Sequence, residues 1–183
     1  DNYLVEDKFI YSSDKSTIYY ASVALSGDYT VPPSVDTIGN YAFSFCMDLN
    51  SVSIPGSVTK IGNGAFAYCY GLKSVSLPNS VTTIGDRTFT CCYALTSISI
   101  PNSVTTIGEQ AFSFCRKLTE VDLPNYLTEI SNGAFWQCSA LTSVSIPNSV
   151  TAIGNSAFGF CSALTSVSIP NSVTAIGEQA FVR

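Results

Sequence analysis

A proline recurs every 23 residues along most of this chain. The series is Pro32, Pro55, Pro78, Pro101, Pro124, Pro147 and Pro170. A fixed period of this length is typical of a solenoid, in which one short supersecondary unit is stacked many times. The sequence therefore constrains the architecture strongly and the chemistry weakly.

Apolar residues keep the same register as the prolines. Eleven residues after each Pro stands a Phe, at Phe43, Phe66, Phe89, Phe112, Phe135, Phe158 and Phe181. Fourteen residues after all but the last Pro stands a Cys, at Cys46, Cys69, Cys92, Cys115, Cys138 and Cys161. The unit reads L-x-x-V-x-I-P-x-x-V-x-x-I-G-x-x-A-F-x-x-C-x-x. One unit alone cannot bury these columns, so we predict that stacked neighbours bury the Phe column throughout.

The segment L-x-x-V-x-I alternates apolar and polar residues, which is the spacing of a strand. It predicts strands at 51–54, 74–77, 97–100, 120–123, 143–146 and 166–169, with 29–31 as a first member. Pro then ends each strand because it has no N–H to donate. Phe, Cys and Leu follow at i, i+3 and i+6, which suits a short helix with one inward face. We expect an α/β right-handed solenoid with parallel strands on its concave face and short helices on its convex face.

Two further columns indicate turns. Asn follows Pro in five units, and we interpret this column as stacked side chains that satisfy backbone groups of adjacent coils. Gly follows the V-x-x-I segment in most units and turns the chain. Ser131 replaces this Gly in one unit, and Thr88 replaces the Ala before Phe in another.

Residues 1–28 do not carry the repeat. Apolar segments at 9–11 and 18–20 flank the polar stretch 12–17, which is a β-hairpin signal. A solenoid needs a cap over its first coil. We predict a hairpin cap at 1–28 and a repeat array at 29–183, with six full units and a partial last unit.

Composition and charge exclude some classes of protein. Apolar residues make up 46% of the chain, and the net charge of −5 argues against nucleic-acid binding, which needs a basic stripe. No apolar run approaches the roughly 20 residues of a membrane-spanning helix, so we expect no membrane insertion of this segment. The chain begins abruptly at Asp1 and stops in mid-repeat at Arg183. We interpret it as a fragment or a mature form, so missing targeting signals carry little weight.

The cysteines predict neither a metal site nor a disulfide framework. Six of the seven share one column, Cys91 is the extra one, and the chain has no His. Zinc sites are built from clustered Cys and His ligands, which this pattern does not supply. Strands lie about 4.8 Å apart, whereas bridged Cβ atoms need about 3.8 Å. We expect buried, reduced thiols that act as small apolar residues, and no metal or other cofactor.

The sequence offers little for catalysis. Without His, neither a Ser-His nor a Cys-His arrangement can form. Glu120 and Asp122 lie two residues apart on one predicted strand, so both point to the same face. A spacing of roughly 7 Å would suit an inverting glycosidase, but the predicted surface is open, and active sites prefer pockets. We therefore predict no catalytic residues.

The outward strand positions form a field of serines that one acidic pair interrupts. The candidate ligand-binding residues are Glu120 and Asp122, the flanking Ser97, Ser99, Ser143 and Ser145, and Trp136. The alternative is that Ser is simply a good solvated strand residue and the acidic pair is drift. A second feature is an aromatic column of Phe45, Tyr68, Phe114 and Phe160, with Trp136 displaced by one residue. Such a row can stack on sugars, dock on a partner, or pack over the edge of the core.

The repeat motif resembles that of the BspA-like leucine-rich repeats. The segment LTSVSIPNSVTAIGNSAFGFCSA at 141–163 is similar to a consensus unit of that family, and the likeness covers about residues 29–183. The segment FIYSSDKSTIYYASVALSGDYTVP at 9–32 also resembles an element that recurs between blocks of such repeats. The resemblance implies surface or secreted proteins of host-associated microbes, some of which are adhesins that bind extracellular-matrix proteins. It does not imply an enzyme.

We therefore expect a non-enzymatic extracellular or cell-surface binding module. Its partner would be a protein, for example an extracellular-matrix protein. Glycan binding through the aromatic row is one alternative, and a structural spacer without its own ligand is another.

Overall fold

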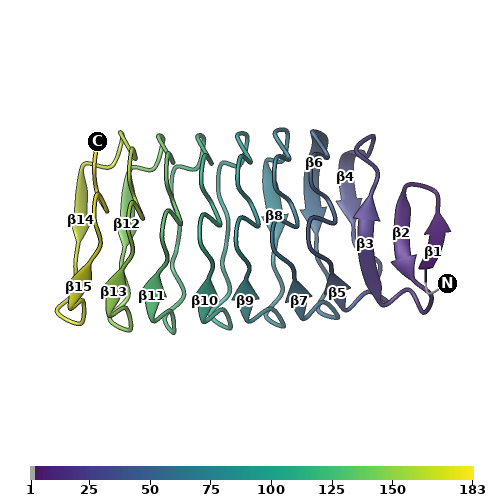
Figure 1. Ribbon diagram of the computed structural model, residues 1–183, viewed down its shortest axis with the longest axis horizontal. Helices are drawn as coiled ribbons and strands as arrows, with labels where there is room; N and C mark the ends of the chain where they lie inside the picture. Colours follow the sequence, from purple (N-terminus) through teal and green to yellow (C-terminus); the bar gives the residue numbers. More distant parts are fainter. Residues whose placement is uncertain (1–2) are drawn as a thin grey trace.

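A computed structural model describes residues 3–183 and shows a solenoid of similar coils stacked along one axis (Figure 1). Each coil has three sides: a strand segment, a second short extended segment, and a run of turns. No helix is present in residues 3–183, so the predicted short helices are wrong. The coils stack with little bend in this view, so the predicted contrast between a concave and a convex face is not evident either.

Two ladders of parallel strands run along the solenoid. The first ladder contains β4 (Ser26–Thr30), β6 (Asp48–Ser53), β8 (Ser74–Ser76), β12 (Ser143–Ser145) and β14 (Ser166–Ser168). The second contains β3 (Thr17–Ala21), β5 (Thr37–Ile38), β7 (Lys60–Ile61), β9 (Thr83–Ile84), β10 (Thr106–Ile107), β11 (Glu129–Ile130), β13 (Ala152–Ile153) and β15 (Ala175–Ile176). Identical columns pair in register, as in Val52 with Val75.

The first ladder thins out in its middle. Of the predicted strands at 97–100 and 120–123, only Ser99 and Asp122 take part, as isolated parallel bridges. These bridges connect Ser76 with Ser99, Ser99 with Asp122, and Asp122 with Ser145. The parallel arrangement was predicted correctly, but fewer residues of these two coils pair with their neighbours than the sequence predicted.

An antiparallel hairpin begins the described chain. β1 (Tyr3–Glu6) pairs with β2 (Phe9–Ser12), and β2 pairs with β3 across the polar turn that the sequence predicted. β3 also pairs in parallel with β5, so the second ladder already starts within residues 1–28. The role of residues 1–28 as a separate cap stays a prediction.

Turns replace the predicted helices on the third side of each coil. Two positions per unit take a positive φ, as at Tyr41 (57°) and Phe45 (63°). Alternate N–H groups there donate to the next coil: Phe43 to the carbonyl of Ala65 at 2.7 Å, and Phe45 to that of Ala67 at 2.9 Å. A left-handed conformation costs a non-Gly residue about 1–2 kcal/mol, which these intercoil bonds offset.

Coil spacing explains why no helix forms. The two ladders set a separation of about 4.8 Å between coils. A helix with its side chains is about 10 Å wide, so helices on successive coils of a straight stack would collide. A run of turns has the same apolar spacing as a short helix, yet it remains one chain thick.

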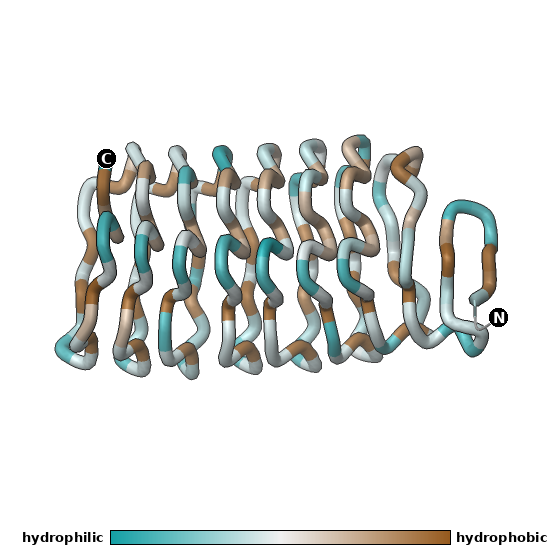
Figure 2. Tube along the Cα trace, in the orientation of Figure 1, coloured by the Kyte–Doolittle hydropathy of each residue, from teal (hydrophilic) through white to brown (hydrophobic). Residues whose placement is uncertain are grey.

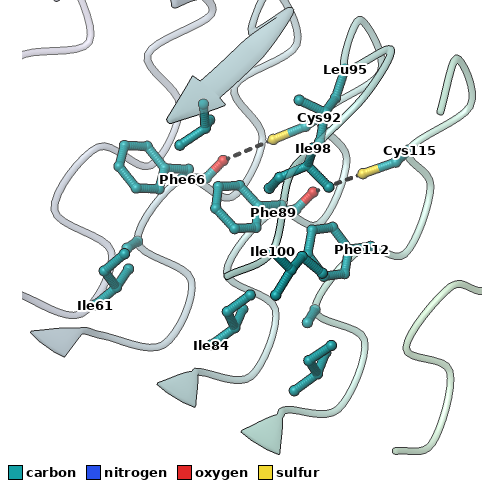
Figure 3. Close-up of a cluster of buried hydrophobic side chains, with 14 of the residues drawn as sticks. Ile61, Phe66, Ile84, Phe89, Cys92, Leu95, Ile98, Ile100, Phe112 and Cys115 are labelled. Atoms are coloured by element: carbon teal, nitrogen blue, oxygen red, sulfur yellow. Dashed lines mark hydrogen bonds between the residues drawn. The ribbon is translucent and has the colours of Figure 1, made fainter. Parts of the chain in front are cut away.

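The core is a continuous column of phenylalanine rings. Ring centroids of successive coils lie 5.0 Å apart for Phe43 and Phe66, and 5.3 Å apart for Phe89 and Phe112. The column is fully buried from Phe43 to Phe158, as the sequence predicted. Burial throughout is wrong at Phe181, which is partly exposed because it has a neighbouring ring on one side only. Apolar bands recur at matching heights on successive coils (Figure 2), and the rings stack behind one another (Figure 3).

We expect Phe112→Ala to destabilise the protein by about 3–5 kcal/mol, because it removes a buried ring and leaves a cavity between coils. Phe181→Ala should cost much less, since its ring contacts only Phe158 in the column and is partly exposed. Denaturant melts of both variants test this. Equal losses would contradict the stacking argument.

The recurring Gly is required because the preceding coil occupies the space that a Cβ would take. A Cβ at Gly85 would lie 2.5 Å from Asn63 Oδ1, and one at Gly154 would lie 2.7 Å from Asn132 Oδ1. These oxygens form a row of side-chain hydrogen bonds that connects successive coils. In this row Asn63 Oδ1 accepts the N–H of Asp86, one coil on, at 3.0 Å. The sequence analysis assigned this role to the Asn after Pro, but that column shows the bond at only one described step, from Asn125 N to Asn102 Oδ1.

Ser131 interrupts both of these patterns. The second ladder breaks between β10 and β11, at the coil where Ser stands in place of Gly. The preceding coil carries Glu109 instead of Asn or Asp, and Ser131 Oγ donates to the Ile107 carbonyl at 2.6 Å. In regular coils the Gly N–H donates to the equivalent carbonyl of the preceding coil, as the Gly108 N–H does to the Ile84 carbonyl. At this coil a side-chain hydroxyl therefore donates to the carbonyl that a backbone N–H reaches in regular coils.

Thr88, the other exception noted in the sequence, fits without a break. Its side chain is fully buried, and its hydroxyl donates to the Gly85 carbonyl at 2.8 Å. The extra polar atom is thus satisfied within the same turn.

We expect Gly85→Ala and Gly154→Ala each to destabilise the fold by about 1–3 kcal/mol, because the added methyl group overlaps the preceding coil. Gly56→Ala is the matched control, since a Cβ at Gly56 meets nothing within 4 Å. Urea unfolding of the three variants makes the comparison. Comparable stability of all three would show that the Gly column has another cause.

Candidate binding surfaces

The exposed side of the first ladder carries six of the seven candidate residues. Glu120, Asp122 and the candidate serines Ser97, Ser99, Ser143 and Ser145 are all exposed there. The bridges from Asp122 to Ser99 and Ser145 place these residues on adjacent strands. Trp136 lies on the turn side, so the candidates belong to two surfaces. We call Glu120 and Asp122 the acidic rung.

The acidic rung has no partner within the described chain. Across residues 3–183, neither carboxylate accepts a side-chain hydrogen bond or forms an ion pair. Asp28, on the same face, is different: its Oδ1 accepts from Ser51 Oγ at 2.7 Å and from Asn50 Nδ2 at 2.9 Å. The Ser51 hydrogen bond, followed by that of Asn50, lowers the pKa of Asp28. The two carboxylates of the rung are therefore free, whereas the carboxylate of Asp28 is already hydrogen-bonded.

A shallow hollow lies beside Asp122, where the first ladder thins. It holds about 330 Å³ and is lined by Ile100, Asn102, Asp122, Leu123, Asn125, Ser145 and Pro147. Its polar lining and open form suit a side chain from a partner better than an enclosed substrate.

The turn side carries a row of aromatic contacts that we call the aromatic ridge. Its members are Phe45, Tyr68, Tyr70, Tyr93, Phe114, Arg116, Trp136 and Phe160. The ring centroids of Phe45 and Tyr68 lie 4.6 Å apart with 5° between the ring planes. Those of Tyr70 and Tyr93 lie 4.8 Å apart with 4° between the planes. Phe45 and Phe160 are each 44% exposed, and the ridge members between Tyr70 and Trp136 are half-buried apart from the exposed Arg116, so the ridge reaches the surface along its length.

Arg116 bridges the gap that Cys91 leaves in the aromatic column. Its guanidinium carbon lies 5.1 Å from the ring centre of Tyr93 and 5.6 Å from that of Phe114. Such cation–π contacts hold the side chain over the ridge. Sequence analysis missed the column that contains Tyr70, Tyr93 and Arg116, although two aromatic residues 23 positions apart were a visible signal.

Trp136 stands where neighbouring coils have small, buried side chains. Its ring meets Phe114 and Phe160 edge-on, at 79° and 75° to their planes. A Cβ at Gly159, in the next coil, would lie 3.0 Å from the Trp136 ring. Gly159 therefore makes room for the indole.

The cysteine column has a role beyond packing. Five of the six thiols donate to the carbonyl of Phe in the preceding coil, as Cys69 does to Phe43 at 3.0 Å and Cys92 to Phe66 at 3.3 Å (Figure 3 shows the latter). Cys46, in the first coil, donates to the Ser22 carbonyl at 3.4 Å instead. The Phe carbonyl also accepts a backbone N–H, as Phe43 O does from Cys46. The thiol therefore satisfies a second lone pair that a purely apolar side chain would leave unpaired.

Burial raises the pKa of the Cys46 and Cys161 thiols from 9.0 to about 11, and raises the pKa of the other four thiols in the column further. The seven cysteines are free thiols. A thiol is a nucleophile only when ionised, so this column is unreactive at neutral pH.

We expect stability to fall as pH rises above about 9. In the unfolded chain the thiols lose their protons first, so the unfolded state binds fewer protons and is favoured, by about 1.4 kcal/mol per pH unit for each thiol. Urea unfolding under reducing conditions measures this slope. Cys161→Ala should remove one thiol's share of it, and an unchanged slope would assign the effect to other groups.

Metal-ligand groups and membrane-spanning helices are both absent from the described residues. Residues 3–183 contain no group of three His, Cys, Asp or Glu side chains that could hold a metal ion. Within the same residues there is no helix of sufficient length and apolar character to cross a membrane.

The structure is a repeat solenoid with two candidate binding surfaces, the acidic rung with its serines and the aromatic ridge. The match to the BspA type leucine rich repeat region covers residues 15–113 and 83–183. The chain therefore belongs to the BspA-type leucine-rich repeat family.

Solved bacterial structures share this fold. A leucine-rich repeat protein from Eubacterium ventriosum is 31% identical, with a TM-score of 0.91 over 99% of this chain and 49% of that one. A leucine rich cell surface protein from Faecalibacterium prausnitzii is 35% identical, with a TM-score of 0.85 over 98% of this chain and 51% of that one. The T. pallidum leucine-rich repeat protein is 32% identical, with a TM-score of 0.82 over 91% of this chain and 81% of that one. The chain thus spans about half the length of the first two proteins. None of the curated proteins compared with it matches.

Proposed function

We propose that this chain is a non-enzymatic, protein-binding segment of a bacterial cell-surface or secreted protein. Membership of a repeat family that is generally protein-binding supports the binding role. The similarity to a cell surface protein from F. prausnitzii supports the location. The partner is a protein, for example one of the extracellular matrix.

The unpartnered acidic rung is the observation that carries this proposal. Two carboxylates on one strand face repel each other, so the pair gives no evident benefit to folding. A basic partner offsets this repulsion, and an Arg side chain can bind a carboxylate through two parallel hydrogen bonds. Ser97, Ser99, Ser143 and Ser145 surround the rung with hydroxyl groups, and the hollow beside Asp122 gives a partner side chain a place to enter.

The test begins with a panel of extracellular-matrix proteins and a glycan array, screened side by side. Binding to a protein with a basic surface is the expected result. Binding only to neutral glycans would favour the glycan alternative, and binding to neither would favour a spacer.

For a protein hit, we expect Glu120→Ser, Asp122→Ser to weaken binding by about tenfold or more, which is about 1.4 kcal/mol, chiefly through a slower association rate. Binding by the original chain should also weaken with salt. Surface plasmon resonance measures both effects.

The control removes equal charge elsewhere: Glu129→Ser, Glu178→Ser alters two exposed residues of the second ladder side. This variant should bind as the original chain does. Unchanged binding by the rung variant would identify the acidic pair as drift.

A further inference from the structure

The aromatic ridge combines seven aromatic side chains with Arg116 on the turn side of the coils. Protein interfaces are enriched in Tyr, Trp, Phe and Arg, and their most energetic residues are mostly Trp, Tyr and Arg. The ridge combines these four types in one continuous row of contacts. Scattered exposed aromatics are ordinary, but a contiguous row marks an interaction site.

The electrostatics of the ridge favour an anionic ligand. Phe45 and Tyr68, and likewise Tyr70 and Tyr93, lie face to face, so within each pair the faces that carry negative charge cover one another. The exposed ring edges carry partial positive charge. The tyrosine hydroxyls, the indole N–H and the guanidinium add hydrogen-bond donors to the same row.

Arg116, within the ridge, and Lys117, the next residue along the chain, are exposed cations without a counter-ion in the described chain. The positions one coil before and after them hold Tyr93 and Ala94, and Ser139 and Ala140, so no carboxylate comes from either neighbouring coil at these columns. A locally positive site thus lies on a chain whose net charge is −5.

We propose that the aromatic ridge binds an extended acidic segment of a protein partner, independently of the acidic rung. Carboxylates of the segment contact Arg116 and Lys117, and its apolar side chains pack on Phe114, Trp136 and Phe160. A sugar ring needs an open aromatic face, and stacking covers the inner faces of four of the seven rings. The ridge therefore fits a peptide better than a glycan.

Trp136 provides a reporter for this site, because it is the single tryptophan of the chain and lies in the ridge. The probe is a synthetic, Trp-free peptide in which Glu alternates with Leu. The same peptide with Lys in place of Glu, heparin, and a neutral oligosaccharide serve as comparisons. We expect the acidic peptide alone to change the Trp136 emission, and to do so less strongly at high salt.

The variant Arg116→Glu, Lys117→Glu should weaken binding of the acidic peptide by at least about tenfold. Arg116→Gln, Lys117→Gln should give a smaller loss, because it removes the attraction without adding repulsion. Both residues are exposed, so we expect each variant to fold, and circular dichroism is the check. Glu120→Ser, Asp122→Ser is the control and should bind the peptide as the original chain does, so failure at one surface is separable from failure at the other.

Three results would overturn the proposal. The first is no emission change with the acidic peptide. The second is equal binding by the charge-reversed variant. The third is a response to heparin or to the neutral oligosaccharide without one to the peptide, which would assign the ridge to a glycan.

Discussion

Hydrogen bonding from coil to coil, on all three sides of the unit, is the constraint on which this structure depends. The two strand ladders set the spacing, and the turn side must match it, so alternate N–H groups there reach the next coil instead of closing a helix. That demand forces non-Gly residues such as Tyr41 and Phe45 into the left-handed region. It also brings the phenylalanine rings within stacking distance and the cysteine thiols within reach of the preceding coil's carbonyls.

The sequence predicted what its columns state directly: the stacked units, the parallel strands, the hairpin and the buried rings. It failed where two structures share one pattern, since the spacing of Phe, Cys and Leu is the same in a helical turn and in this run of turns. It also misplaced the row of side-chain hydrogen bonds, because Asn after Pro and Asn after Gly look equally regular until the backbone is known. For the candidate surfaces, strand alternation placed Glu120 and Asp122 on one exposed face, but only coordinates could show that Arg116 connects Tyr93 to Phe114.

Several exceptions to the repeat stand 22 or 23 residues from a second irregular residue, whereas Thr88 is satisfied within its own turn. Ser131 follows Glu109, and the Trp136 ring is accommodated by Gly159 in the next coil. Gly64 likewise lies under the Tyr41 ring, where no side chain would fit. An irregular residue in one coil is thus compensated in an adjacent coil, so its environment is set by one neighbour and hardly at all by the rest of the array.

This pairing limits how such a protein can change length. Adjacent units, such as those that start at Leu141 and Leu164, are nearly identical in sequence, so unequal recombination between them would add or remove whole coils. A regular coil can be copied anywhere, because every interface it forms is the standard one. The coil with Trp136 is instead fitted to the following coil, because a Cβ in place of Gly159 would lie 3.0 Å from the indole ring. The unit that can be duplicated without loss of packing is therefore one coil where the array is uniform, and two coils at the aromatic ridge around Trp136.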